Sequence, residues 1–119
     1  IRDMEIPSDS VLLLQKYQDD LYQLDSYYRW FYRAFDQIEE NEKYMQARER
    51  IENIYANDYL LQMVPKWNAV FYEQAESTFD QCGLVRQDRF FSHYLHAYDG
   101  KERIIVIISD ALRYECAKE

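Results

Sequence analysis

The chain has 119 residues, which is enough for one domain with a hydrophobic core of its own. Its 22 acidic and 14 basic side chains give a formal net charge of −8, which argues against general nucleic-acid binding and against docking on an anionic membrane. Two cysteines, Cys82 and Cys116, are too few for a disulfide-stapled secreted domain, so we predict reduced thiols in a cytoplasmic protein.

The first predicted helix spans about residues 9–39, with Ser8 as its N-cap. Apolar residues recur along it in steps of three and four, the pattern of a helix packed lengthwise on another. This seam consists of Leu14, Tyr17, Leu21, Leu24, Tyr28, Phe31, Phe35 and Ile38. In the second half Tyr27, Trp30 and Tyr32 lie off the seam, so we expect this end to be deeply buried or to contact parts of a larger protein.

Three further helices are predicted before Gly100. The second spans about residues 42–64, and its short polar link to the first predicts an antiparallel hairpin. Pro65 suits the first turn of a third helix, which ends near Gly83. A fourth, shorter helix covers about residues 88–98.

Residues 103–109 form a β-branched apolar run without polar alternation, which is typical of a strand buried on both faces of a parallel sheet. A helix-forming stretch follows at once, so the order is that of the first half of a βαβ unit. Its aliphatic core, 104–108, is far shorter than the roughly 20 apolar residues of a membrane-spanning helix. One strand cannot build a parallel sheet, so we expect the chain to be a piece of a longer protein.

The predicted fold is therefore mainly α, a bundle of about four helices followed by a single strand and a helix start that form the stub of a truncated α/β domain. An isolated strand leaves its backbone donors and acceptors unpaired. We therefore expect residues 103–109 either to pair with another copy of the chain or to lie in a groove between helices.

Asp110 is the most informative residue, because it stands where the predicted strand ends and the next helix begins. Ligands of open α/β sheets bind outside the carboxyl ends of the strands, and a carboxylate there is a suitable ligand for a divalent metal. Aspartate is also a preferred N-cap, and local physics favours that interpretation. The two roles are compatible with each other.

Other polar residues give weaker candidates. Ser109 has no neighbouring base and is interpreted as a strand-end hydroxyl. Arg113 could reach a phosphate, but is interpreted as a helix-surface residue near Asp110, Asp99 or Glu115. His93 and His96 have a spacing that can chelate a metal, but such pairs are common by chance, and we do not predict a site there.

The segment 105–115, Ile-Val-Ile-Ile-Ser-Asp-Ala-Leu-Arg-Tyr-Glu, resembles the opening motif of the PglZ domain. Proteins with this domain occur in type 1 BREX phage-defence systems and belong to the alkaline phosphatase superfamily. Looser likenesses in residues 25–32, 52–60 and 87–91 extend the resemblance over most of the chain. It implies that residues 1–100 are a helical region upstream of a catalytic domain, and that 101–119 are the first strand and helix start of a truncated PglZ domain.

The resemblance implies that Asp110 is a metal ligand, and that the nucleophile and the remaining ligands lie beyond Glu119. The whole protein would then be a metal-dependent phosphoester hydrolase using Zn²⁺, Mn²⁺ or Mg²⁺, while this chain would bind no cofactor and be inactive on its own. The alternatives are a helical module that binds other defence-system proteins, or a spacer without a site. An exposed aromatic patch around Tyr27, Trp30 and Tyr32 would favour the module over the spacer.

Overall fold

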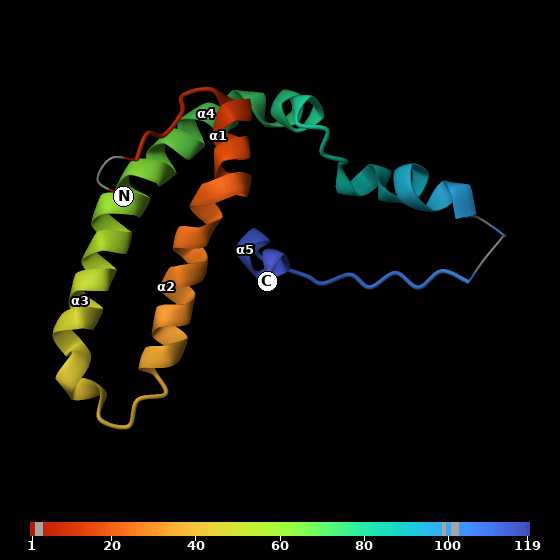
Figure 1. Ribbon diagram of the computed structural model, residues 1–119. Coiled ribbons are helices and arrows are strands. Elements are labelled where there is room, and N and C mark those ends of the chain that lie inside the picture. Colours follow the sequence, from red (N-terminus) through yellow and green to blue (C-terminus); the bar gives the residue numbers. More distant parts are fainter. Residues whose placement is uncertain (2–3, 99, 101–102) are drawn as a thin grey trace.

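The computed structural model describes residues 1, 4–98, 100 and 103–119. The chain is elongated, with principal extents of 60 × 37 × 19 Å and a Cα radius of gyration of 18.9 Å. Two long helical rods lie side by side, and a C-terminal arm returns to the first of them (Figure 1). The described residues are mainly helical, which confirms the predicted fold class in that respect.

The first rod consists of α1 (Ser10–Lys16), the π-helical segment η1 (Tyr17–Leu21) and α2 (Tyr22–Phe35). Asp9 caps it, and not Ser8 as predicted, because Asp9 Oδ1 accepts the backbone N–H of Leu12 at 2.9 Å. The rod ends four residues earlier than expected, since the N–H groups of residues 37 and 38 bond three residues back and tighten the last turn.

The second rod contains the 3₁₀ segment η2 (Asn41–Tyr44), α3 (Met45–Asn53), the π-helical segment η3 (Ile54–Leu60) and α4 (Leu61–Gln81). It runs back along the first rod, so the expected antiparallel hairpin forms (Figure 1). The prediction for Pro65 was wrong, because Pro65 lies inside α4. Pro65 has no N–H to donate to the Leu61 carbonyl, but both residues are exposed, so water can solvate that carbonyl.

The hydrophobic core lies where α1 crosses α4 and where η3 meets η1. It is built from Ile6, Leu13, Leu21, Tyr59 and Met63. Leu14, Leu21 and Phe35 of the predicted seam are buried, whereas Ile38 is exposed because the helix ends before it. Among the described residues no helix combines the length and the apolar character needed to cross a membrane.

Beyond α4 the chain becomes irregular. Gly83 adopts a φ of +68°, and Leu84 N–H bonds the Phe79 carbonyl at 2.9 Å, so Gly83 ends the helix as predicted. The expected fourth helix is present as three short helical segments, η4 (Gln87–Arg89), η5 (Phe91–Leu95) and η6 (His96–Tyr98).

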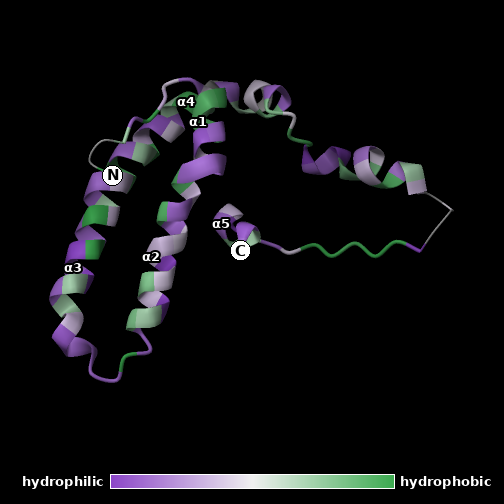
Figure 2. Cartoon of the chain, in the orientation of Figure 1, coloured by the Kyte–Doolittle hydropathy of each residue, from purple (hydrophilic) through white to green (hydrophobic). Residues whose placement is uncertain are grey.

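The predicted strand is not formed: residues 103–109 are extended, but no strand occurs among the described residues. A strand is defined by its ladder of backbone hydrogen bonds, and within the described part of the chain no second extended segment lies beside this one to supply it. Nor does the segment lie in a groove, since every residue from 103 to 109 is exposed and the Ile107 side chain is 88% exposed. Figure 2 shows it as a hydrophobic arm in the open. Pairing with a second copy stays a prediction.

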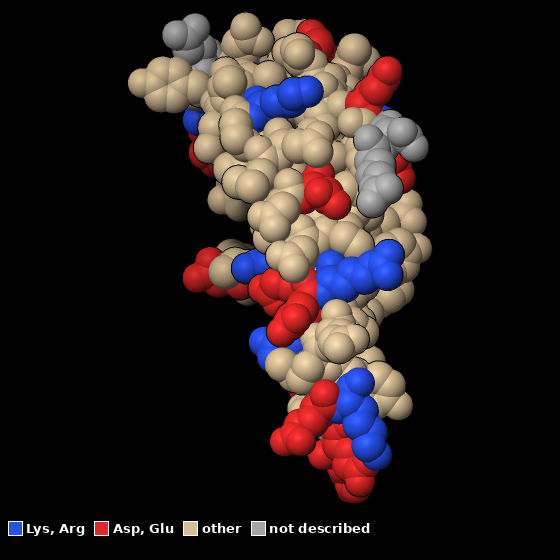
Figure 3. All heavy atoms as spheres, turned by 90° about the vertical axis from the view of Figure 1, so that its left-hand side faces the viewer, with Lys and Arg blue, Asp and Glu red and all other residues tan. Residues whose placement is uncertain are grey.

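Acidic and basic side chains are intermixed on the outer face of the second rod, which contains α3. Seen from that side, both kinds gather towards the lower end, near the turn of the helical hairpin, and the upper part is mostly uncharged (Figure 3). Glu40 and Lys43 form an ion pair at this turn, and both are well exposed. The part of this face that the structure describes therefore carries no large patch of a single charge.

Candidate functional site

Asp110 lies at the end of the extended arm, in a turn, and its side chain is exposed. The helix that follows, α5 (Tyr114–Lys118), begins four residues later, with Arg113 at the N-cap position. The N-cap interpretation of Asp110 is therefore wrong for this structure. Ala111 accounts for the offset, because its φ of +54° is left-handed and interrupts the path from Asp110 into a right-handed helix.

The donor set around Asp110 does not amount to a metal site by itself. Among the described residues no group of three or more His, Cys, Asp or Glu side chains could hold a metal ion. A divalent ion needs several oxygen or nitrogen ligands, so further ligands would have to come from outside the described part of the chain. The assignment of Asp110 as a ligand stays a prediction.

The weaker candidates lie apart from any such cluster. Ser109 is exposed, and Arg113, at the N-cap position of α5, lies 4.0 Å from Glu115, one of its three expected neighbours. Another of them, Asp99, lies outside the described residues. His93 and His96 are exposed on η5 and η6, and the His93 ring packs against Tyr94 at 4.7 Å.

The most buried carboxylate of this region is Glu115 on α5, which the sequence did not single out. Its side chain is 5% exposed, and Oε1 lies 3.0 Å from Arg29 Nη1 on α2. The same guanidinium nitrogen also donates to the Cys116 sulfur. α5 is thus attached to a helix 86 residues earlier in the chain (Figure 1).

Aromatic side chains surround this ion pair. The Tyr114 ring meets Tyr22 edge-on at 5.7 Å and lies 5.9 Å from Tyr17, and its hydroxyl donates to the Gln18 carbonyl at 3.2 Å. Lys118 Nζ lies 5.5 Å from the centre of the Tyr22 ring, within the range of a cation–π contact. α5 is therefore held by packing as well as by charge.

Asp25 is the second polar residue that the sequence reasoning missed. Its two oxygens accept hydrogen bonds from the hydroxyls of Tyr17 and Tyr55, each at 2.7 Å. Burial, followed by the hydrogen bond to Asp25, raises the pKa of both tyrosines well above the usual value. Burial and then the Asp25 charge do the same for the pKa of Tyr59. The only sequence signal was an acidic residue amid an aromatic stretch.

The π-helical segments place these tyrosines. Tyr17 belongs to η1 on the first rod, while Tyr55 and Tyr59 belong to η3 on the second. A π turn is wider than an α turn and shifts the following side chains around the axis, a feature often found at functional sites. Here the two segments face each other across Asp25, which joins the rods.

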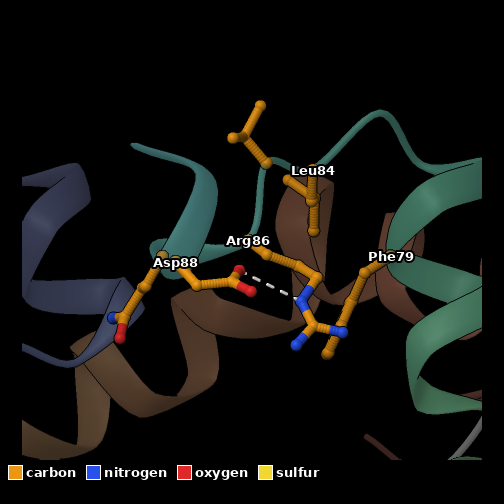
Figure 4. A pocket seen from close by; sticks show the side chains of 6 residues that line it. Phe79, Leu84, Arg86 and Asp88 are labelled. Carbon is orange, nitrogen blue, oxygen red and sulfur yellow. Dashed lines mark hydrogen bonds and ion pairs between the residues drawn. The ribbon is translucent and has the colours of Figure 1, made fainter. Parts of the chain in front are cut away.

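A separate hollow opens where α4 ends. It is lined by Phe79, Leu84, Val85, Arg86, Gln87 and Asp88. Arg86 Nε and Asp88 Oδ1 face each other there at 3.2 Å, so these charges are directed at one another (Figure 4). None of the predicted site residues lines this hollow.

Comparison with known proteins places the chain in a class. It is 40% identical over 108 residues to the "Alkaline phosphatase-like protein PglZ" of Bacillus cereus (strain H3081.97). The aligned residues make up 90% of this chain and 13% of that protein. It is 32% identical over 118 residues to the "Alkaline phosphatase-like protein BrxZ" of Escherichia coli O9:H4 (strain HS), covering 93% of this chain and 14% of that protein. The chain is therefore related to alkaline phosphatase-like proteins.

More particularly, the chain is a relative of the PglZ-type proteins, which confirms the resemblance seen in the sequence. It spans only 13% to 14% of the length of these relatives. No protein-family model matches the chain, and no solved structure matches it.

Proposed function

We propose that this chain is part of a phage-defence protein of the BREX type that hydrolyses phosphoesters in a metal-dependent reaction. The observation that carries the proposal is the 40% identity over 90% of the chain to a protein named as alkaline phosphatase-like. Because the chain spans 13% of that relative, the activity is proposed for the whole protein. The chain on its own, with Asp110 as its single candidate ligand, is proposed to be inactive.

Asp110 is the proposed metal ligand of this chain. Residues 104–108 are apolar without interruption, as is typical of a strand covered on both faces of a parallel sheet. Once that strand is paired, Asp110 stands at its carboxyl end, where α/β proteins bind ligands. A bound Zn²⁺, Mn²⁺ or Mg²⁺ would supply Lewis-acid stabilisation of phosphate oxygens, and the role of this chain is to hold one carboxylate in place.

The test uses the whole protein and two substitutions of Asp110. Hydrolysis of p-nitrophenyl phosphate and of bis-p-nitrophenyl phosphate is measured with Zn²⁺, Mn²⁺ or Mg²⁺ for the wild type, Asp110→Ala and Asp110→Asn. Glu49→Ala, which removes an exposed carboxylate from α3, is the matched control. Metal-dependent hydrolysis that both Asp110 variants lose and the control keeps supports the proposal. Hydrolysis that survives Asp110→Ala in a folded protein rejects Asp110 as a ligand.

A second candidate function, a module that binds other defence-system proteins in the cytoplasm, has a specific observation in its favour. Tyr27 and Trp30 are 56% and 49% exposed, with their rings edge-on at 5.6 Å, so part of the expected aromatic patch is present. Tyr32 is not part of it, because its hydroxyl contacts Glu52 on α3. Under this function, Tyr27→Ser lowers co-purification of partner proteins and leaves hydrolysis unchanged, whereas unchanged co-purification contradicts it.

A further inference from the structure

We propose that the ion pair between Arg29 on α2 and Glu115 on α5 fastens α5 to the helical region, and that Glu115 is thereby a positioning residue for Asp110. The inference rests on the proposed function of Asp110. It goes beyond that function by assigning the helical region a task, which is to hold the segment that carries the metal ligand.

The burial of Glu115 is the first argument. Glutamate is rarely buried unless it is paired, and here the side chain is 5% exposed against 40% for Arg29. Glu115 is covered only because α5 lies on α2 and the tyrosines beside it. Arg113, at 4.0 Å and well exposed, provides a weaker second cation. Without Arg29, docking of α5 would bury a carboxylate with little to offset its lost hydration.

The shortness of α5 is the second argument. A helix of five residues is not stable in isolation, since helix nucleation costs more than so few hydrogen bonds return. Its helical form therefore depends on contacts with α2 and η1. The ion pair holds its second residue, the Tyr114 hydroxyl fixes its start, and Trp30 Nε1 donates to Glu119 Oε1 at 2.6 Å just beyond its end.

The third argument is reach. Asp110 precedes Tyr114 by four residues, and a fully extended chain spans at most about 3.6 Å per residue. With Tyr114 held against η1 and α2, the Asp110 backbone stays within about 14 Å of that anchor on the helical region. Release of α5 would remove this restraint. The tether limits where Asp110 can lie relative to the helical region, and catalytic rates are sensitive to the placement of a catalytic group.

Hydrogen–deuterium exchange on the 119-residue chain tests the fastening. The amides of Cys116 and Ala117, which bond the Arg113 carbonyl, report on the helical form of α5. In Arg29→Glu two carboxylates face each other, and we expect these amides to exchange about tenfold faster. Arg33→Glu makes the same charge change on an exposed site of α2 and is the matched control.

The charge swap Arg29→Glu with Glu115→Arg reverses the ion pair, and we expect it to restore slow exchange. Glu115→Gln keeps the shape of the side chain without its charge and should give an intermediate rate. If Arg29→Glu exchanges at the same rate as Arg33→Glu, the ion pair does not fasten α5 and the inference is overturned.

The whole protein then separates this inference from the proposed function. Mn²⁺ affinity, measured by calorimetry, and kcat are expected to fall about tenfold in Arg29→Glu and to recover in the charge swap, while KM changes little. If Asp110→Ala binds Mn²⁺ as the wild type does, the proposed function fails, even where the exchange data uphold the fastening. If Asp110→Ala abolishes binding but Arg29→Glu leaves it unchanged, the positioning role of Glu115 is overturned.

Discussion

Replacement of Asp25 by alanine is the sharpest test of how the two rods are held together. The Asp25 carboxylate accepts one hydrogen bond from Tyr17 on its own rod and one from Tyr55 on the opposite rod, each at 2.7 Å. In Asp25→Ala both hydroxyls lose their acceptor, and the polar link between the rods at this position is broken.

The expected loss in the free energy of unfolding follows from the type of hydrogen bond that Asp25→Ala removes. A hydrogen bond to a charged group contributes about 1.5–3 kcal/mol, and two bonds to one carboxylate are not additive. Asp25 is also partly exposed, so water can replace some of what is lost. We therefore expect Asp25→Ala to lower the free energy of unfolding by about 2–3 kcal/mol. Asp25→Asn keeps one acceptor oxygen, and about 1 kcal/mol is expected.

Urea denaturation at pH 7, followed by circular dichroism, measures these changes on the 119-residue chain. Asp20→Ala is the matched control, because it removes an exposed carboxylate from the same rod. Tyr55→Phe should cost less in the Asp25→Ala background than in the wild type, since the bond is already gone. An Asp25→Ala variant within about 0.5 kcal/mol of the control would refute the assigned role.

Three further predictions follow from burial and exposure. Leu13→Ala should lower the free energy of unfolding by about 2–5 kcal/mol in urea denaturation, because Leu13 is wholly buried, and a loss comparable to that of a surface substitution would contradict the core described above. The pKa values of Tyr17, Tyr55 and Tyr59 are raised in the fold, so the stability they contribute is fully present below about pH 10 and is lost as the pH rises from there. The urea midpoint should therefore fall between about pH 9 and pH 11, and Tyr17→Phe should reduce that fall. Ile107→Lys should lower the dimer fraction in sedimentation velocity if residues 103–109 pair between copies, and a wild-type chain that is monomeric with these residues freely mobile would refute such pairing.

The helical part of the fold was accessible from the sequence because its signals are local. Apolar spacing located the helices of both rods, although it divided the second rod at Pro65. The polar link predicted the antiparallel arrangement, and Gly83 marked the end of α4. The predictions of the N-cap and of the role of Pro65 were wrong, because each depends on the surroundings of the residue in the fold. Ser8 and Asp9 are both good caps, and only the position of the first helical turn decides between them. Pro65 was expected at a helix start, but it lies inside α4, where water can solvate the carbonyl that it leaves unpaired.

The polar contacts were beyond sequence reasoning because they join residues far apart in the chain. Glu115 meets Arg29 across 86 positions, and Asp25 meets Tyr55 across 30. The tyrosines that donate to Asp25 lie on the π-helical segments η1 and η3, and periodicity analysis assumes an α-helix throughout. The role of Asp110 stays a prediction for the same reason, since a metal site is assembled from distant residues.

The extended residues 103–109 and the helix α5 need different kinds of contact, and this explains why α5 is folded and 103–109 are not paired. α5 needs only side-chain contacts, and α2 and η1 supply them within the chain. Residues 103–109 need backbone partners, which only further strands can give, so the segment stays extended and exposed. Ala111 joins the two segments in a left-handed conformation that costs about 1–2 kcal/mol.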